Sequence, residues 1–350
     1  MQALFSSHRS EGNPSKGMVV ATRREVAEAA NVSVRTVSNV VNGFPSIAPE
    51  TRARVLRVIE EMDYRPSQIA RILKRGRSGL VALVLPELDT PYFAELTRAF
   101  VELGGEHGFT VIIDQTDGDS QRELELINQS DHGTLFDGVI VSPLGLTAKD
   151  ADAISSERPV VFLGEETHPG FDHVRIDNFA AAREATAHLI ASGRRKVAAL
   201  GAQRALVRSS SIRLSGYRQA LDDAGIEFDA HLIGYVEEFR RPDGATAMAQ
   251  LLDGPEVPDA VFCFSDPLAL GAMRTLHERG VRIPEDIALV GFDDIEDGHF
   301  SFPTLTSISP DKGFIASRAL ELLSAHINGT AVAPSEYLAP YRLIVRESSA

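Results

Sequence analysis

The sequence predicts a small all-α headpiece joined to a larger α/β body with parallel sheets. The chain has 350 residues, 43% of them hydrophobic, which is too long for one ordinary hydrophobic core. Residues 18–77 show short helical patterns, whereas from Gly79 onward short apolar runs alternate with helical stretches. Such alternation is typical of parallel sheets covered by helices on both faces. We therefore expect two or three domains.

Charge is distributed unevenly between these parts. The whole chain carries a net charge of −14, yet residues 18–77 hold 11 basic and 6 acidic residues, a balance of +5. Residues 1–17 add +1, so the remainder carries −20. A small basic head on an acidic body predicts a polyanionic partner for the head alone.

The headpiece begins with the pattern of a capped helix. Thr22 and Glu25 fit a capping box, and an apolar stripe follows at helical spacing. Ser33 is placed to cap a second helix over residues 34–41. Two short helices joined by a tight turn predict a helix-turn-helix, whose second helix enters the major groove with its N-terminal residues. Its inward positions would be Val37, Val40 and Val41, its exposed positions Val34, Arg35 and Asn39, with Thr36 and Ser38 placed for phosphates.

A third helix is expected after Pro49, which suits a first helical turn, because apolar residues repeat at i, i+4 and i+7 from Val55. Its N-cap position holds Ala48, which has no side-chain acceptor. Residues 63–66 end this helix and residues 67–74 form a short basic stretch. Eight residues cannot hold a helix alone in water, so this stretch should fold only against DNA or a partner. The alternative is a small helical bundle with incidental charge.

Four stretches of the headpiece carry a family resemblance: residues 22–42, 51–52, 64–66 and 70–73. They resemble the headpiece of the LacI/GalR (lactose/galactose repressor) family. The resemblance implies that residues 67–74 form a hinge helix, with Leu73 wedged into the minor groove, where unstacking is offset by added contact. Asn39 departs from the family, which usually has Arg there, and Asn favours adenine where Arg favours guanine. The DNA-binding residues are then Thr22, Ser33, Val34, Arg35, Thr36, Ser38, Asn39, Asn42, Ala70 and Leu73.

Seven strands are expected in the body, with helices between them. Ligands in such sheets bind beyond the carboxyl ends of the strands, and polar residues follow several of the expected strands. The strands are expected at residues 80–85, 110–114, 138–142, 160–163, 196–200, 260–264 and 287–291, with helices such as 93–106, 179–191 and 267–279.

Catalytic and metal-binding motifs are missing from the sequence. It has no P-loop, no dinucleotide-binding glycine motif, no nucleophile elbow and no zinc-protease motif. Residues 114–119 lack the spacing of a calcium loop and fit a solvated turn. His168, His173 and His299 lie in polar stretches and are expected at the surface. We therefore expect no enzyme, no cofactor and no metal site.

The compartment expected is the cytoplasm. The sequence has no run of about 18 apolar residues that could span a membrane, and residues 1–17 lack the apolar region of a secretory signal. Residues 1–19 are expected to be a disordered extension, and Met18 could be an alternative start. The single cysteine, Cys263, lies in an apolar run and is expected to be a buried thiol.

The LacI/GalR resemblance continues through the body in an ordered series of stretches, among them residues 89–95, 136–140, 213–217 and 283–294. It covers roughly residues 20–346 and implies a two-lobed periplasmic-binding-protein-like fold with an effector between the lobes. The implied bounds are a headpiece at 20–66, a hinge at 67–77, lobe 1 at about 78–177 and 309–338, and lobe 2 at about 178–308 and 339–346. The implied effector-binding residues are Tyr92, Phe93, Ser142, Arg213, Phe239, Ser265 and Asp293.

The matching positions suggest specific roles in the cleft. Arg213 and Asp293 would clamp ligand hydroxyls or a carboxylate through charge-assisted hydrogen bonds. Phe239 would stack on the ligand, and Ser265 stands where the family usually has Asn. Alternatively, Asp293 could cap a turn and Phe239 could belong to the core. Asp266 is expected to be structural, as the N-cap of the following helix.

Together these features predict a DNA-binding transcription regulator of the repressor type, acting as a homodimer on a near-palindromic operator. A small polar effector, such as a sugar or sugar derivative, would shift the population toward or away from the DNA-competent state. Residues 346–350 leave no room for a heptad helix, so no tetramer through a C-terminal coiled coil is expected. The alternatives are a solute-binding protein without a regulatory role, or an enzyme acting on a small polar metabolite.

Overall fold

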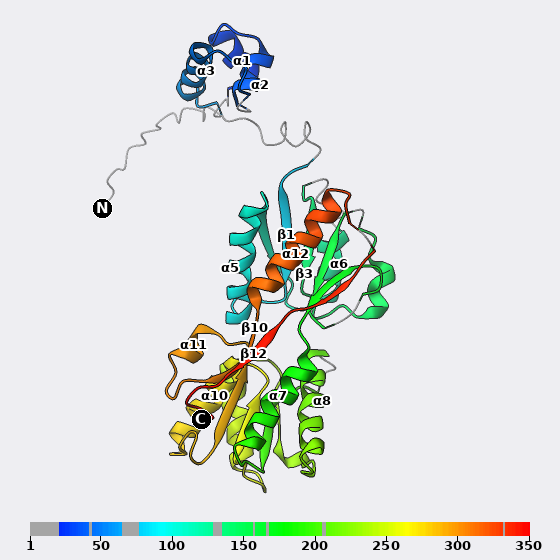
Figure 1. The fold of residues 1–350 in the computed structure, drawn as a ribbon, viewed down its shortest axis with the longest axis vertical. Coiled ribbons are helices and arrows are strands. Elements are labelled where there is room, and N and C mark those ends of the chain that lie inside the picture. Colours follow the sequence, from blue (N-terminus) through cyan, green and yellow to red (C-terminus); the bar gives the residue numbers. More distant parts are fainter. Residues whose placement is uncertain are drawn as a thin grey trace, which may run out of the picture. The chain divides into compact units, whose positions relative to one another are not determined.

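The chain divides into two compact units, Met1–Ser78 and Gly79–Ala350 (Figure 1). The computed structural model describes residues 21–41, 44–64, 77–128, 135–156, 158–165, 168–204, 208–331 and 333–350. The first unit holds three described helices, and the second holds two parallel-dominated sheets flanked by helices. This arrangement confirms the predicted fold class of an all-α head and an α/β body.

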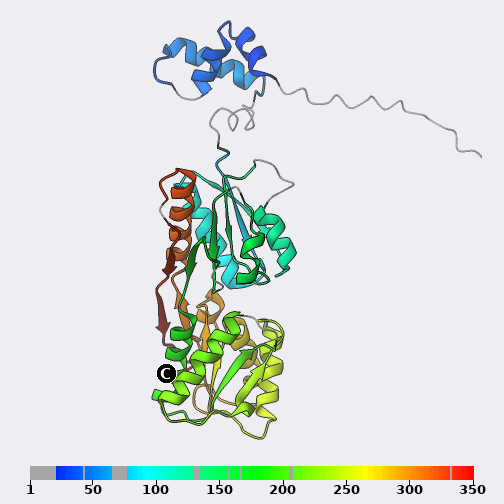
Figure 2. The same ribbon diagram turned by 90° about the vertical axis from the view of Figure 1, so that its right-hand side faces the viewer.

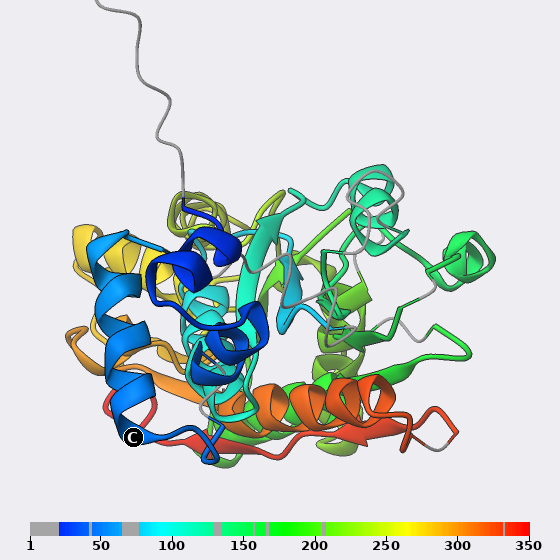
Figure 3. The same ribbon diagram turned by 90° about the horizontal axis from the view of Figure 1, so that it is seen from above.

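The headpiece consists of α1 (Arg23–Ala29), α2 (Val34–Val41) and α3 (Pro49–Glu61), seen from above in Figure 3. The capping box is confirmed, because Glu25 N donates to Thr22 Oγ1 at 3.3 Å and Thr22 N donates to the Glu25 carboxylate at 2.6 Å. Ala48 caps α3 without any side-chain hydrogen bond, as expected. The headpiece core is formed by the fully buried side chains Val26, Val37 and Val55 with their neighbours.

Lobe 1 is built on a sheet with the strand order β11-β5-β4-β3-β1-β2, in which the described strands are all parallel. The strands are β1 (Leu80–Leu85), β2 (Thr110–Gln115), β3 (Gly138–Val141), β4 (Val160–Leu163), β5 (Asp172–Arg175) and β11 (Glu336–Leu338). Its helices are α5 (Pro91–Glu106), α6 (Ser120–Asn128), η1 (Ala148–Ala153) and α12 (Lys312–Ile327).

Side chains alternate along β1 between the two faces of this sheet. Leu83 shares a core with Phe100 of α5 and Leu320 of α12, whereas Val84 shares a separate core with Ile127 of α6. Figure 1 shows α5 and α6 to the two sides of β1, with α12 passing in front of the sheet. Both faces are therefore covered, which explains why β1 is apolar at every position.

Lobe 2 is built on a second sheet with the order β12-β10-β9-β8-β6-β7, in which β12 alone of the described strands runs antiparallel. The strands are β6 (Val197–Ala202), β7 (Ile233–Tyr235), β8 (Ala260–Cys263), β9 (Ala288–Phe292), β10 (Thr306–Pro310) and β12 (Tyr341–Ile344). The helices are α7 (Asn178–Ala191), α8 (Arg208–Asp223), η2 (Ala230–Leu232), α9 (Arg241–Leu252), α10 (Asp266–Glu278) and α11 (Glu296–His299).

The chain passes between the lobes three times: from β5 to α7, from β10 to α12, and from β11 to β12. Figure 2 shows the lobes stacked along the body with these crossings on one side. The last crossing brings Ser348 into the core of lobe 2, where Leu289 N donates to its carbonyl and its hydroxyl donates to Leu289 O, both at 2.8 Å. Both lobes are thus assembled from segments distant in the sequence.

The seven expected strands are all present, and five further strands were not predicted. These five contain three to five residues each, and two of them, β5 and β10, carry polar residues at buried positions. They are β5, β7, β10, β11 and β12. None of the described helices is long and apolar enough to cross a membrane.

Helices α9 and α10 pack closely because each carries a glycine at the contact. A Cβ on Gly271 would lie 2.0 Å from Arg241 O, and one on Gly244 would lie 2.2 Å from Leu268 O. Both clashes are with backbone atoms, which cannot move aside as the end of a side chain can. The pairing of these helices therefore depends on the two glycines.

We expect Gly271→Ala to destabilise the body by about 1–3 kcal/mol, the usual cost of overpacking. Gly105→Ala in α5 is the matched control, since a Cβ there meets nothing within 4 Å. Replacing this helical glycine by alanine should instead stabilise the protein by roughly 0.5–1 kcal/mol, because alanine loses less conformational freedom on folding. Thermal unfolding followed by circular dichroism measures both changes. Equal melting temperatures for the two variants would contradict the packing argument.

Candidate functional site

Helix α2 presents its N-terminal turn to solvent. Val34 is 45% exposed, Arg35 is exposed, and Asn39 is half-buried. The expected cap is present, because Thr36 N donates to Ser33 Oγ at 3.1 Å. Val41, expected to face inward, is only partly buried at the edge of the headpiece core. The structure thus leaves Val34 and Arg35 accessible at the start of α2, whereas Asn39 lies nearer its C-terminal end.

Several headpiece hydroxyls and arginines are already engaged inside the headpiece. The hydroxyls of Ser33 and Thr36 lie 2.9 Å apart and share a hydrogen bond, so Thr36 is less free for phosphate than expected. Arg54 donates to Ala30 O at 3.0 Å, joining α3 to α1. Arg35, by contrast, makes no hydrogen bond or ion pair with other described residues, which leaves its guanidinium available. Three predicted DNA-binding residues lie outside the described residues: Asn42, Ala70 and Leu73.

A cavity of about 340 Å³ opens between the two lobes at the carboxyl ends of their strands. All seven residues predicted to bind effector line it. Lobe 1 contributes Tyr92, Phe93 and Ser142, and lobe 2 contributes Arg213, Phe239, Ser265 and Asp293. Tyr92 and Phe93 meet edge to face at 5.2 Å, and burial raises the pKa of Tyr92 well above its usual range. Their roles in binding stay a prediction.

Arg213, in α8, is held firmly in the cavity wall. Its Nε donates to Asn178 Oδ1 at 2.7 Å, its Nη1 donates to Phe264 O, and its guanidinium lies 3.6 Å from the centre of the Phe292 ring. Asn178 opens α7 just after the first crossing between lobes and also donates to Glu165 of lobe 1. Arg213 is therefore fixed by the Phe264 carbonyl, which follows β8, and by Asn178, which follows the first crossing between the lobes.

Asp293 follows β9 in a backbone conformation that L-residues seldom adopt, with φ at 108°. The buried carboxylate of Asp266 braces this loop by accepting from Ile295 N at 2.9 Å and from Ser307 Oγ at 2.6 Å. Asp266 is structural, as expected, but it is not the helix cap. Ser265 caps α10 instead, accepting from Leu268 N while also lining the cavity.

The Asp293 side chain lines the cavity. It is 7% exposed, and no described residue donates a hydrogen bond to its side chain. Burial raises the pKa of Asp293 to about 7, even though the charges of Arg213 and Lys312 oppose the rise. Such a group gains most from a ligand that brings a hydrogen-bond donor.

Phe239 is half-buried, so its ring packs on the edge of the core and also reaches the cavity. The two interpretations left open for this residue are therefore compatible. Contact of Phe239 with a ligand stays a prediction.

Sequence reasoning missed two residues that support the cavity, Glu165 and Lys312. Glu165 follows the end of β4, so the rule that polar residues at strand ends form sites could have found it. Lys312 Nζ is only 13% exposed and donates to Glu95 at 2.7 Å and to Asp293 O at 2.6 Å. The other oxygen of Glu95 accepts from Glu296 N at 3.0 Å. Lys312 thus ties α5 of lobe 1 to the loop that carries Asp293.

Arg240 forms a second link across the cleft, at its mouth. This lobe 2 residue lies 3.2 Å from Asp89 and 3.9 Å from Glu87, both of lobe 1, and 2.6 Å from Glu238 of its own lobe. The neighbouring Arg241 pairs within lobe 2, with Asp297 at 2.8 Å.

The expectation of surface histidines was wrong for His168 and His173. Both are buried, at 0% and 2% exposure, and stack on Phe162 with ring centres 4.3 Å and 5.2 Å away. Burial lowers the pKa of His173 to about 4. His299 is exposed, as expected. Among the described residues, no group of three or more His, Cys, Asp or Glu side chains is placed to hold a metal ion.

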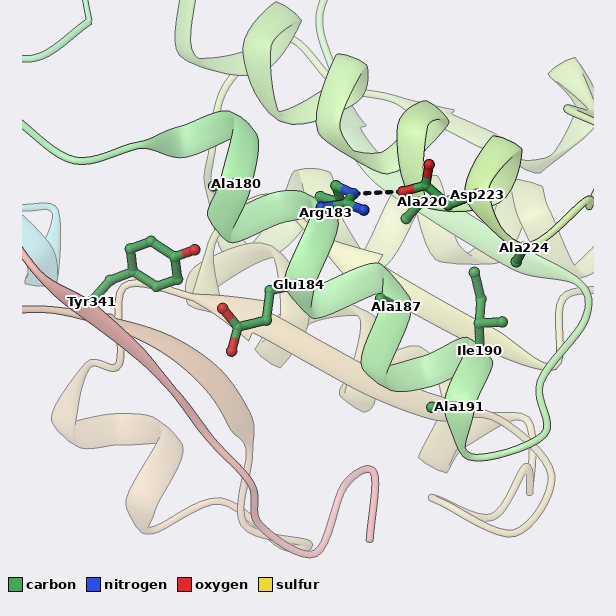
Figure 4. Close-up of a pocket in the computed structure, with 10 residues that line it drawn as sticks. All are labelled: Ala180, Arg183, Glu184, Ala187, Ile190, Ala191, Ala220, Asp223, Ala224 and Tyr341. Carbon is green, nitrogen blue, oxygen red and sulfur yellow. Dashed lines mark hydrogen bonds and ion pairs between the residues drawn. The ribbon is translucent and has the colours of Figure 1, made fainter.

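A more open cavity of about 530 Å³ lies on lobe 2 between α7 and α8 (Figure 4). Five of its ten lining residues are alanines, and the Arg183–Asp223 ion pair lies across it at 2.5 Å. Its other polar side chains, Glu184 and Tyr341, are hydrogen-bonded to each other, so this surface offers few free polar groups to orient a small polar ligand. The interlobe cavity is the candidate site.

Comparison with known proteins agrees with this arrangement. Residues 22–67 match the family described as bacterial regulatory proteins, lacI family, and residues 186–349 match the periplasmic binding protein-like domain. The HTH-type transcriptional regulator CelR of Thermobifida fusca is 35% identical over 340 residues, covering 93% of this chain and 98% of that protein. The chain belongs to the lacI family.

Two solved structures extend the comparison of this lacI-family chain. The lac repressor dimer bound to operator and the anti-inducer ONPF has a TM-score of 0.82 at 27% identity, covering 94% of this chain and 99% of that one. A CelR–cellobiose complex has a TM-score of 0.69 at 32% identity, with coverage of 94% and 99%. The relatives named here are transcription regulators.

The contacts of Arg240 predict that Arg240→Ala shifts the lobes of this lacI-family protein toward wider separation. The ion pairs of Arg240 with Asp89 and Glu87 are largely exposed. The shift in lobe separation should therefore be modest and should vanish in high salt, which screens surface charges. Distances between spin labels on the two lobes would measure it. Arg241→Ala is the control, since its ion pair lies within lobe 2. A similar response of the two variants would contradict the assignment of Arg240 as a link between the lobes.

The raised pKa of Asp293 predicts a pH-dependent loss of stability in the empty protein. This carboxyl binds its proton more tightly when folded than when unfolded, so its contribution falls as pH rises from about 4 to about 7. Asp293→Asn should therefore gain stability relative to the parent over that range, by at most about 1.4 kcal/mol per pH unit. Melting temperatures of both proteins from pH 4 to 8 give the comparison. If the melting temperatures of the two proteins change with pH in parallel, the pKa of Asp293 is not raised.

Proposed function

We propose that this protein is a sequence-specific transcription regulator, acting as a repressor, whose operator affinity is controlled by a small polar effector bound between the lobes. The observation that supports this most is the combination, in one lacI-family chain, of an accessible recognition turn on α2 with an interlobe cavity lined by all seven predicted effector residues.

The headpiece would read DNA through α2. Arg35 can donate two hydrogen bonds to a guanine edge, Val34 can contact a thymine methyl group, and Asn39 can pair with adenine. Because α1 and α3 share a core with α2, they hold this helix as a rigid body against the groove. The two reciprocal hydrogen bonds between Thr22 and Glu25 fix the N-terminal end of α1, where it would contact a DNA phosphate.

Effector control would operate through the arrangement of the lobes. A ligand that contacts Tyr92 and Phe93 on one side and Arg213 and Asp293 on the other stabilises one separation of the lobes over others. Coupling to operator affinity follows if headpiece binding favours one of those separations. Operator titrations with and without ligand measure the size and the sign of this coupling.

The protein would act as a homodimer in the cytoplasm. The related lac repressor structure is a dimer on operator, and a two-fold dimer matches a near-palindromic site. On lobe 2, Phe300 and Phe302 are 81% and 97% exposed, an unusual pair of uncovered aromatic side chains. Burying both against a second copy would remove them from water.

An enzyme is less well supported than a regulator. Ser142, Ser209 and Ser265 line the cavity, but no histidine, cysteine or lysine is among its described lining residues to activate a hydroxyl. A solute-binding protein would use the same cavity, yet it would have no use for the headpiece. DNA binding by the full chain distinguishes these alternatives.

Arg35→Ala should weaken operator binding by about 1–3 kcal/mol and relax the preference at one base pair, because a bidentate contact is lost. Arg57→Ala removes an exposed charge from α3 and should leave the sequence preference intact. Mobility-shift titration against a library of operator variants reports both quantities. If Arg35→Ala changes neither affinity nor preference, α2 is not the recognition helix.

A further inference from the structure

We infer that the interlobe cavity selects a polyhydroxyl ligand without an anionic group and rejects sugar phosphates and sugar acids. The inference rests on the proposed function of this cavity as the effector site and specifies the chemical class of its ligand. It follows from which charged groups in the cavity wall are already bonded to other protein groups and which are not.

The two arginines that line the cavity are both committed to other protein groups. Arg213 is bonded to Asn178 and to the Phe264 carbonyl, with its face against the Phe292 ring. Arg175 pairs with Glu336 and donates to Ile176 O. An anionic ligand is best held by a guanidinium that offers both prongs of its fork, and neither arginine does so.

Carboxylates outnumber arginines in the wall. The six carboxylates that line the cavity belong to Glu87, Asp117, Glu165, Glu237, Glu238 and Asp293. Arg240 lies beside Glu87 and Glu238 and compensates their charge from the mouth of the cleft. No described cation lies within ion-pair distance of the other four carboxylates.

Two of these four carboxylates, Glu165 and Asp293, are half-buried and buried, respectively. Glu165 accepts a hydrogen bond from the neutral amide of Asn178, and Asp293 receives none from any described residue although it is only 7% exposed. A ligand hydroxyl or amine placed against Asp293 supplies the missing donor, whereas an anion there adds repulsion in a poorly solvated place. Burial raises the pKa of Asp293 although the charges of Arg213 and Lys312 oppose the rise.

The remaining wall suits the carbon face of a ring that carries hydroxyls. Phe239, Tyr92 and Phe93 supply apolar surface from both lobes, and Ser142 and Ser265 supply neutral donors and acceptors. This mixture of aromatic faces and neutral polar groups orients a hydroxylated ring without requiring a charge on it.

The charge of the cavity can be tested before its ligand is known. The single native cysteine, Cys263, is 0% exposed and burial raises its pKa, so it should not react with thiol reagents. In full-length protein carrying Ser142→Cys, we would measure reaction rates at pH 8 with a cationic and an anionic methanethiosulfonate reagent. The ratio of these rates, divided by the ratio for free 2-mercaptoethanol, reports the local potential.

We expect the cationic reagent to be favoured by about tenfold or more, the range over which charged clefts concentrate counter-ions. Adding Asp293→Asn and Glu165→Gln to Ser142→Cys should bring the ratio toward one. A ratio at or below one before neutralisation, or a ratio unaffected by the two substitutions, overturns the inference.

A second measurement separates this inference from the proposed function. Thermal shifts of the full chain with cellobiose, glucosamine, glucose 6-phosphate and gluconate should show no stabilisation by the last two. Stabilisation by either anion overturns the selectivity while leaving a ligand-binding regulator intact. Loss of operator binding by the unmodified chain would instead refute the regulator, whatever the cavity charge.

Discussion

The buried carboxylate of Asp266 is the interaction on which the cavity depends. It fixes the turn after β9 by holding Ile295 N and Ser307 Oγ, and there is no room beside it for a side chain at position 291, where a Cβ would lie 2.1 Å from Asp266 Oδ1. Burial and the charge of Asp293 raise the pKa of Asp266. This brace acts together with Ile308 O, which accepts from Asp293 N, and with Lys312, which donates to Asp293 O, to hold Asp293 at its positive φ.

The same loop links the two lobes. Its carbonyls at Asp293 and Asp294 accept from Lys312, which also pairs with Glu95 of α5, and Glu95 in turn accepts from Glu296 N. Helix α5 carries Tyr92 and Phe93, so the aromatic wall of lobe 1 and the acidic wall of lobe 2 share one half-buried cation, Lys312. Displacement of the Asp293 loop by a ligand would therefore be transmitted to α5 through direct contacts.

Local features were well predicted from sequence, whereas features that depend on distant contacts were not. The capping box of Thr22 and Glu25 and the alternating sheet elements follow from short-range spacing. The seven cavity residues came from family resemblance, and the structure places them together. Glu165, Asn178 and Lys312 gain their roles only from partners far along the chain, such as Asn178 between Glu165 and Arg213. His168 and His173 looked polar in sequence, but stacking on Phe162 allows their burial.

The contact between Ser348 and Leu289 has a consequence for synthesis of the protein. Strand β12 pairs with β10, and Ser348 bonds both Leu289 and Thr306, so residues 341–349 complete the sheet of lobe 2. Lobe 1 has most of its sheet once β5 has left the ribosome, but lobe 2 must wait for the last crossing. During that interval the edge of β10 has no partner strand, which makes lobe 2 the part of a growing chain most in need of protection from aggregation.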